Sequence, residues 1–66
     1  MTPTLKQLTQ RAHNIRVHAA ALADALENFS LVPEAWNEVC RASFQHKAET
    51  IEQAATDLAK ALREAK

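Results

Sequence analysis

An unbroken heptad pattern of apolar residues runs through the first half of this 66-residue chain. Neighbouring apolar positions are separated alternately by three and four residues, which places their side chains on one stripe of an α-helix. The members of this first stripe are Leu5, Leu8, Ala12, Ile15, Ala19, Leu22, Leu26 and Phe29. Thr2 followed by Pro3 is a suitable helix entrance. Thr4 with Gln7 offers a capping box as the alternative. The pattern predicts a helix over about residues 3–29.

A second stripe of the same kind follows after a short interruption. Its members are Phe44, Ala48, Ile51, Ala55, Leu58, Leu62 and Ala65. Between the stripes, Ser30 is a candidate cap for a new helix that carries Pro33 in its first turn, or Pro33 is itself the first helical residue. We therefore expect a turn at about 30–33 and a second helix over about 34–65. So short a connection requires the two helices to run antiparallel.

The composition agrees with an all-α fold. Alanine, leucine, glutamate, glutamine, lysine and arginine dominate, and the chain has no glycine and no tyrosine. The common residues are strong helix formers, whereas tight β-hairpins depend on glycine. The sequence therefore predicts a single domain over residues 1–66, folded as an antiparallel two-helix hairpin.

Small residues alternate with large ones along both stripes. Alanine recurs at every seventh position, at Ala12 and Ala19 in the first stripe and at Ala48 and Ala55 in the second. We expect these alanines to let the two helices approach closely, while larger apolar residues fill the layers between them. The alternative is that alanine only supplies helix propensity.

A hairpin of this size has little core. Each stripe is buried against one neighbouring helix only, and such a core rarely offsets the entropy lost when the chain is ordered. The single cysteine forms no internal disulfide, and no grouping of cysteine and histidine has the spacing of a metal site. We therefore predict that two copies associate as a homodimer and form a four-helix bundle. Parallel and antiparallel arrangements of the two hairpins both satisfy the stripes.

Residues that carry chemistry are few and scattered. His13 and His18 are five residues apart, so they diverge on a helix. His46 and Glu49 are three residues apart, but two ligands without a third make a poor metal site. Cys40 lacks an orienting carboxylate and is interpreted as a small buried thiol. We predict a protein that is not an enzyme, with no catalytic residues, no cofactor and no metal.

The charge balance and the short apolar runs indicate which partners and which cellular location to expect. The formal net charge is zero, and nucleic-acid binding depends on neutralising phosphates, so nucleic acid is not the expected partner. The segment MTPTLKQLTQR lacks the apolar stretch of a signal peptide. The longest strictly apolar run, residues 19–23, is too short to cross a bilayer. We expect a cytoplasmic protein without membrane contact.

The only tryptophan lies beside the predicted turn, within SLVPEAWNEVC. Tryptophan is favoured at interface hot spots, and the charged residues around Trp36 resemble the polar rim of such an anchor. The residues predicted to contact a partner protein are Leu31, Val32, Glu34, Trp36, Glu38 and Val39. The alternative is that Trp36 closes the end of the bundle and packs on Phe29 and Cys40. Both roles hold together if one edge of the ring stays exposed.

Two segments, TLKQLTQRAHNIRVHAAALADALENF and VPEAWNEVCRASFQHKAETIEQ, cover nearly the whole chain. Their size and layout resemble a group of small phage-encoded anti-activators. Members of that group bind a host LuxR-type quorum-sensing regulator and can also engage a pilus-assembly ATPase. The resemblance implies a homodimer in the host bacterial cytoplasm whose surface sequesters a transcription activator and blocks its binding to DNA.

Two other functions agree with a short helical hairpin. A type III secretion co-chaperone would cover the apolar face of a needle subunit and act as a heterodimer partner. An RNA-binding bundle would resemble plasmid copy-number regulators, with Lys6, Arg11, Arg16 and Lys47 as candidate contacts. Zero net charge and the absence of surface aromatic residues argue against RNA.

Overall fold

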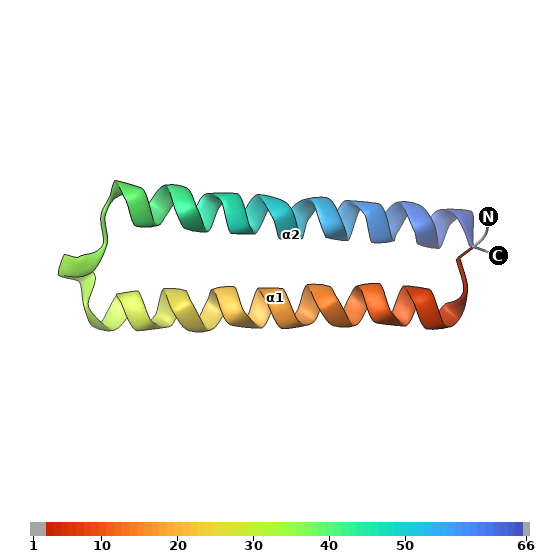
Figure 1. Cartoon of the computed structure of the whole chain (residues 1–66), viewed down its shortest axis with the longest axis horizontal. Coiled ribbons are helices and arrows are strands. Elements are labelled where there is room, and N and C mark those ends of the chain that lie inside the picture. Colours follow the sequence, from red (N-terminus) through yellow and green to blue (C-terminus); the bar gives the residue numbers. More distant parts are fainter. Residues whose placement is uncertain (1–2, 66) are drawn as a thin grey trace.

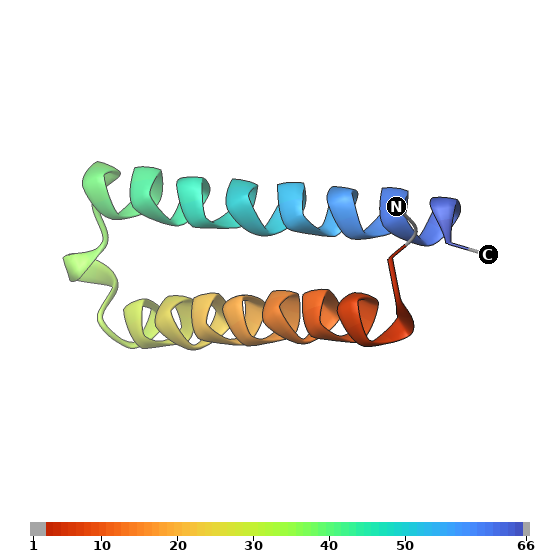
Figure 2. The same cartoon turned by 45° about the vertical axis from the view of Figure 1, so that its right-hand side comes forward.

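The computed structural model describes residues 3–65, which form two long antiparallel helices joined by a short connection (Figure 1). Helix α1 spans Leu5–Leu31, the 3₁₀ helix η1 spans Pro33–Ala35, and helix α2 spans Glu38–Glu64. The molecule is a rod with extents of 49 × 16 × 12 Å, and the two helices lie side by side in both views (Figure 2). The predicted all-α helical hairpin is confirmed.

The first helix begins with a capping box. The backbone N–H of Gln7 donates to the hydroxyl oxygen of Thr4 at 3.2 Å, and the backbone N–H of Thr4 donates to the Gln7 side-chain oxygen at 2.9 Å. This satisfies two of the free N–H groups at the start of α1. The helix therefore begins at Leu5 and not at residue 3 as predicted, and Thr2 lies outside the described residues.

The turn lies further along the chain than the sequence suggested. Ser30 is still part of α1, where its hydroxyl donates to the carbonyl oxygen of Glu27 at 2.6 Å, so it does not cap a new helix. Pro33 begins η1, where its missing N–H costs nothing because a first-turn N–H has no partner within a helix. The prediction of a turn at 30–33 was therefore wrong by several residues.

The second helix begins at Glu38, four residues later than predicted. Its cap is Asn37, whose side-chain oxygen accepts a hydrogen bond from the backbone N–H of Cys40 at 3.0 Å. Asparagine is among the best N-cap residues because its short side chain reaches a free N–H of the first turn. Trp36 and Asn37 are both extended, and they separate η1 from α2.

The two helices meet along every seventh residue. The half-buried members of this contact are Leu8, Ile15, Leu22 and Phe29 of α1 and Phe44, Ile51 and Leu58 of α2. Of residues 3–65, Ala61 alone is buried, with 6% of its surface exposed. The core is thus one layer of side chains between two helices.

The other half of each predicted stripe is exposed. These residues are Leu5, Ala12, Ala19 and Leu26 of α1 and Ala48, Ala55 and Leu62 of α2. The prediction that the recurring alanines bring the two helices of one hairpin together was therefore wrong. The small residues that do lie within the hairpin contact are Ala61 and the half-buried Ala25. A heptad stripe consists of two rows about 50° apart around the helix axis, and one neighbouring helix covers only one row.

We expect Asn37→Ala to lower the free energy of unfolding by about 1 kcal/mol, because it removes the cap of α2. Urea unfolding at a fixed protein concentration measures this change. Asn28→Ala is the matched control, since it replaces an exposed asparagine inside α1 by a better helix former. Equal losses in the two variants would contradict a capping role for Asn37.

Candidate interaction surfaces

The exposed rows of the two helices lie on the same side of the hairpin. We call this surface the stripe face, and it consists of Leu5, Ala12, Ala19, Leu26, Ala48, Ala55 and Leu62. Viewed along each helix from its N-terminus, the exposed row is rotated about the helix axis by about 50° from the half-buried row. The sense of this rotation is the same in both helices. Because the helices are antiparallel, equal turns bring both rows to one side. The leucines are well exposed there, Leu5 at 80% and Leu62 at 53%.

The hairpin exposes more surface than a compact monomer of its mass. Its accessible area is 5361 Å², for a mass of 7.3 kDa. A compact monomer of this mass has about 4,200 Å² of accessible surface, so the hairpin exposes roughly 1,200 Å² more. A stable protein interface removes about 800 Å² from each partner. The excess is therefore large enough to accommodate one such interface.

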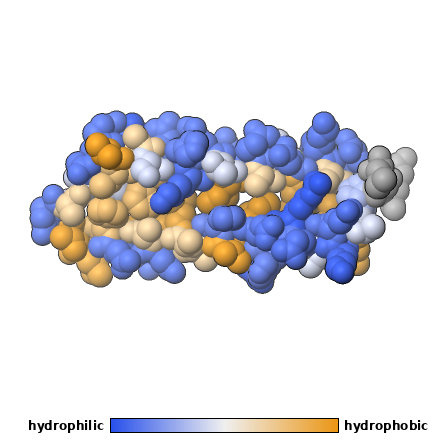
Figure 3. Space-filling model, in the orientation of Figure 1, coloured by the Kyte–Doolittle hydropathy of each residue, from blue (hydrophilic) through white to orange (hydrophobic). Residues whose placement is uncertain are grey.

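A second surface lies at the turn end. We call it the turn surface, and it consists of Leu31, Val32, Glu34, Trp36, Glu38 and Val39, which are all exposed. Leu31 is 81% exposed and Val39 is 79% exposed. Figure 3 shows that apolar residues gather over the half of the molecule near the turn, while polar residues dominate the other half. The six residues predicted to contact a partner are thus all exposed at or beside the turn, and their binding role stays a prediction.

Trp36 packs against two other aromatic rings and is still partly exposed. Its ring centroid lies 5.4 Å from that of Phe29 and 5.5 Å from that of Phe44. Phe29 and Phe44 also meet edge to face at 5.7 Å, so the three rings form one cluster across the end of the hairpin. Trp36 nevertheless remains 39% exposed. Its packing partners are two phenylalanines from α1 and α2, which hold the indole in one orientation.

An ion pair lies beside this cluster. The Arg41 guanidinium donates two hydrogen bonds to the Glu38 carboxylate, one of them from Nε at 2.7 Å. This hydrogen bonding lowers the pKa of Glu38 below its usual value, because it stabilises the ionised carboxylate. Both side chains are exposed, so the pair fixes the orientation of the Glu38 and Arg41 side chains and adds little to the stability of the fold.

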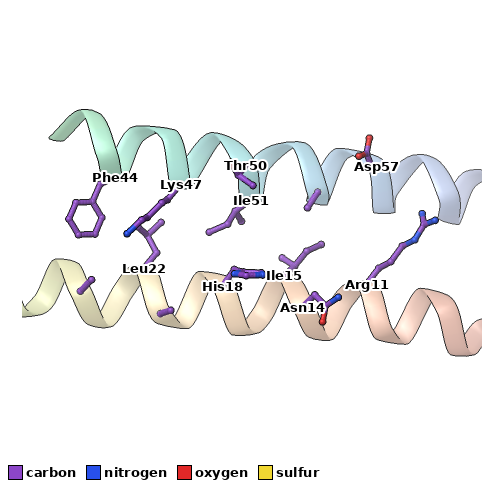
Figure 4. A pocket seen from close by; sticks show the side chains of 13 residues that line it. Arg11, Asn14, Ile15, His18, Leu22, Phe44, Lys47, Thr50, Ile51 and Asp57 are labelled. Atoms are coloured by element: carbon purple, nitrogen blue, oxygen red, sulfur yellow. The ribbon is translucent and has the colours of Figure 1, made fainter. Parts of the chain in front are cut away.

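A groove runs between the helices on the side opposite the stripe face. Its volume is about 610 Å³. Large apolar side chains from both helices form its floor, and Figure 4 shows Leu22, Ile15, Phe44 and Ile51 pointing into the space between the helices. Alanines form part of the walls: Ala21, Ala25 and Ala54. The polar residues along the edges are Arg11, Asn14, His18, Lys47, Thr50 and Asp57.

The sequence reasoning missed this groove, although a signal for it exists. Arg11, His18 and Ala25 follow each other at intervals of seven, three residues after the buried row of α1. Lys47, Ala54 and Ala61 do the same in α2. Such a row borders the buried row on the side away from the stripe face. This row contains both polar and apolar residues, so a search for apolar positions at heptad spacing does not find it.

The four basic residues suggested for RNA binding do not form one patch. Arg11 and Lys47 line the groove. Lys6 and Arg16 line a separate hollow on α1, together with Leu5 and Ala12 of the stripe face. The guanidinium of Arg16 lies 3.1 Å from Nδ1 of His13 at this hollow. The structure thus divides the basic residues between two surfaces.

Over residues 3–65, histidine, cysteine, aspartate and glutamate form no group of three that would hold a metal ion. Cys40 is half-buried and its thiol points at the carbonyl oxygen of Ala35, with Sγ and O 3.8 Å apart. Neither described helix has an apolar stretch of the length and hydropathy needed to span a bilayer.

Comparison of this chain with protein-family models, with curated proteins and with solved structures found no match.

We expect the pKa of Glu38 to lie below the usual glutamate value, and Arg41→Gln to raise it towards that value. Because the pKa of Glu38 is lowered in the folded state, its pair with Arg41 stabilises the folded state above the usual glutamate pKa. This stabilisation is lost as the pH falls through the lowered pKa of Glu38. Titration of the side-chain carboxyl signal by NMR measures both values. The remote substitution Arg63→Gln is the control; an equal shift there would show that general charge, and not this pair, sets the Glu38 pKa.

Proposed function

We propose that this chain is a non-catalytic protein–protein interaction module that works as a homodimer. The observation that carries the proposal is the stripe face, where the second row of both heptad stripes is exposed on one side of the hairpin. A continuous heptad pattern whose second row faces solvent has the form of an unfilled helix–helix interface. A second copy supplies the helices that fit it, because it presents the same alternation of alanine and leucine.

The dimer that follows is a four-helix bundle. Each helix then has two neighbours, one within its own hairpin and one from the partner copy, so both rows of each stripe are covered. Ala12, Ala19, Ala48 and Ala55 would let the two hairpins approach closely, while leucines fill the layers between them. A twofold axis brings the same surface of each copy together, as closed dimers require.

The turn surface is the part of the molecule that we assign to another protein. Leu31, Trp36 and Val39 are exposed apolar residues at the turn end, and the chain carries the carboxylates of Glu34 and Glu38 between and beside them. The aromatic cluster holds the indole in place, so binding loses little side-chain freedom. An ordered tryptophan with apolar neighbours and a charged edge is typical of an interface anchor.

We further propose that the bound protein is a host bacterial protein, such as a LuxR-type quorum-sensing activator, with a pilus-assembly ATPase as a second partner. This extends the resemblance to small phage-encoded anti-activators, which are helical-hairpin inhibitors of that kind. Binding would sequester the activator and prevent its contact with DNA. The support lies in the size, the hairpin and the exposed turn surface of this chain.

The alternative function is that of a type III secretion co-chaperone. The exposed stripe face also agrees with a co-chaperone function, because an apolar helix of a needle subunit would cover that face in place of a second copy. The oligomeric state of the isolated protein separates the two functions. A co-chaperone would be insoluble or monomeric alone, whereas the proposed inhibitor is a soluble dimer.

At micromolar concentration we expect the protein to sediment at twice its 7.3 kDa chain mass. Ala19→Arg combined with Ala55→Arg should raise the dimer dissociation constant about a hundredfold or more, because it places unpaired charges inside the bundle. Ala20→Arg is the control, since Ala20 is exposed and is turned about 200° from the half-buried Leu22. A folded wild-type monomer in analytical ultracentrifugation would contradict the dimer.

In the second test, a purified LuxR-type regulator is bound to fluorescent operator DNA. We expect the wild-type protein to release the DNA, and Leu31→Ser with Val39→Ser to weaken this effect. Trp36→Ala should cost roughly 2–4 kcal/mol of binding, as expected for a hot-spot residue. Val17→Ala is the control, because it truncates an exposed apolar residue remote from the turn. Regulator that stays on DNA at saturating protein would rule out this partner.

A further inference from the structure

The position of the groove leaves it open to a partner in the proposed dimer. It lies on the opposite side of the hairpin from the stripe face, since its edge rows and the stripe rows border the buried rows on opposite sides. In the proposed four-helix bundle the stripe face is covered and the groove faces outward. The inference below rests on the proposed role as an interaction module and concerns the partner that this second surface accepts.

The shape of the groove suits one α-helix. Along α1 it runs from Arg11 to Ala25, which corresponds to about 21 Å or four turns of a helix lying alongside. Its floor is apolar, formed by residues such as Leu22 and Phe44. The alanines at its walls leave room for a third helix at about 8–10 Å from the axes of α1 and α2.

The charges of the groove are mainly positive. Arg11 of α1 and Lys47 of α2 line it with positive charges, and His18 of α1 lies between them (Figure 4). Lys47 also stands over the ring of Phe44, with Nζ 5.4 Å from the ring centroid, which keeps the ammonium close to the apolar floor. Among the described residues lining the groove, Asp57 supplies the single carboxylate. That carboxylate accepts a hydrogen bond from Gln53 at 2.9 Å, and Figure 4 shows it pointing away from α1.

These charges disfavour a second copy as the occupant. A twofold self-contact through the groove would place Arg11 and Lys47 against the same residues of the other copy, with only Asp57 to offset them. A helix that carries carboxylates beside an apolar stripe avoids this repulsion. It would place its apolar residues on the floor and its carboxylates opposite the two cations.

We propose that the groove binds an amphipathic α-helix of a partner protein, with aspartate or glutamate residues flanking its apolar stripe. This is the helix-in-groove mode of recognition, in which apolar anchors spaced three and four residues apart give affinity and the flanking charges give specificity. The complex is a three-helix arrangement on the outer face of each hairpin.

A pair of designed peptides tests this proposal. Each has about 18 residues, with leucine and alanine along one helical face, and the flanking positions are glutamate in one peptide and lysine in the other. We expect the glutamate peptide to bind the wild-type protein in fluorescence anisotropy and the lysine peptide not to bind. Arg11→Glu combined with Lys47→Glu should weaken the glutamate peptide about tenfold or more, because it reverses both edge charges.

The matched control is Lys60→Glu combined with Arg63→Glu, which changes the net charge equally at exposed positions outside the groove. It should leave binding of the glutamate peptide unchanged. Circular dichroism confirms that each variant is helical; if the charge reversal unfolds the protein, Arg11→Gln combined with Lys47→Gln replaces it, with the same direction of effect. Equal binding of the two peptides, equal weakening by both double variants, or no binding to a folded protein would each overturn the proposal.

Two further measurements separate this proposal from its alternatives. Anionic vesicles offered in place of the peptide should not retain the protein, and retention that is lost on reversing Arg11 and Lys47, without peptide binding, would assign the groove to a lipid surface and overturn the proposal. Sedimentation of the same samples reports the dimer independently. A monomer that binds the glutamate peptide would refute the proposed homodimer and support the groove, whereas a dimer that binds no peptide would refute the groove alone.

Discussion

Each helix of a hairpin has a single long neighbour, and one neighbour covers only one row of a heptad stripe. Here the covered rows are those of Leu8, Ile15 and Leu22 in α1 and of Phe44 and Ile51 in α2. The rows of Ala19 and Ala55 remain exposed, and with one buried residue among the described ones the core is thin. The accessible area in excess of a compact monomer follows from the same limit. This one constraint creates the stripe face.

The turn end holds a cluster of three aromatic rings. Phe29, Trp36 and Phe44 come from three separate segments, and their rings contact one another in pairs. The cluster closes the end of the hairpin while part of the indole stays exposed. The two roles considered for Trp36 are therefore not exclusive: packing fixes the ring, and the fixed ring is what makes its open edge suitable for recognition.

Three surfaces of one small hairpin differ in chemistry, and the difference separates their proposed partners. The stripe face is apolar and suits a second copy. The turn surface combines exposed apolar residues with the carboxylates of Glu34 and Glu38, and the groove combines an apolar floor with Arg11 and Lys47. The groove is bordered by Arg11 and Lys47, whereas the turn surface carries Glu34 beside the Glu38–Arg41 ion pair, so the partners proposed for the two surfaces differ in charge. In the proposed dimer, the two surfaces would therefore take two different kinds of protein.

The sequence by itself determined the two helices, their antiparallel order and the residues gathered at the turn. Heptad spacing and helix propensity are local properties, and the connection was too short for any other arrangement. The Thr4–Gln7 capping box was also readable, although Asn37 was overlooked as the cap of α2 because Pro33 gave the stronger local signal.

Only the tertiary structure decided which row of each stripe is covered. The spacing of Ala12 and Ile15 is equally compatible with either row facing the other helix, and the choice depends on how the packed helices are rotated about their axes. The same rotation placed Arg11, His18 and Lys47 along a groove, from positions that look like ordinary surface residues in the sequence. Rotation is set by side-chain packing across the whole interface, and no local pattern in the chain encodes it.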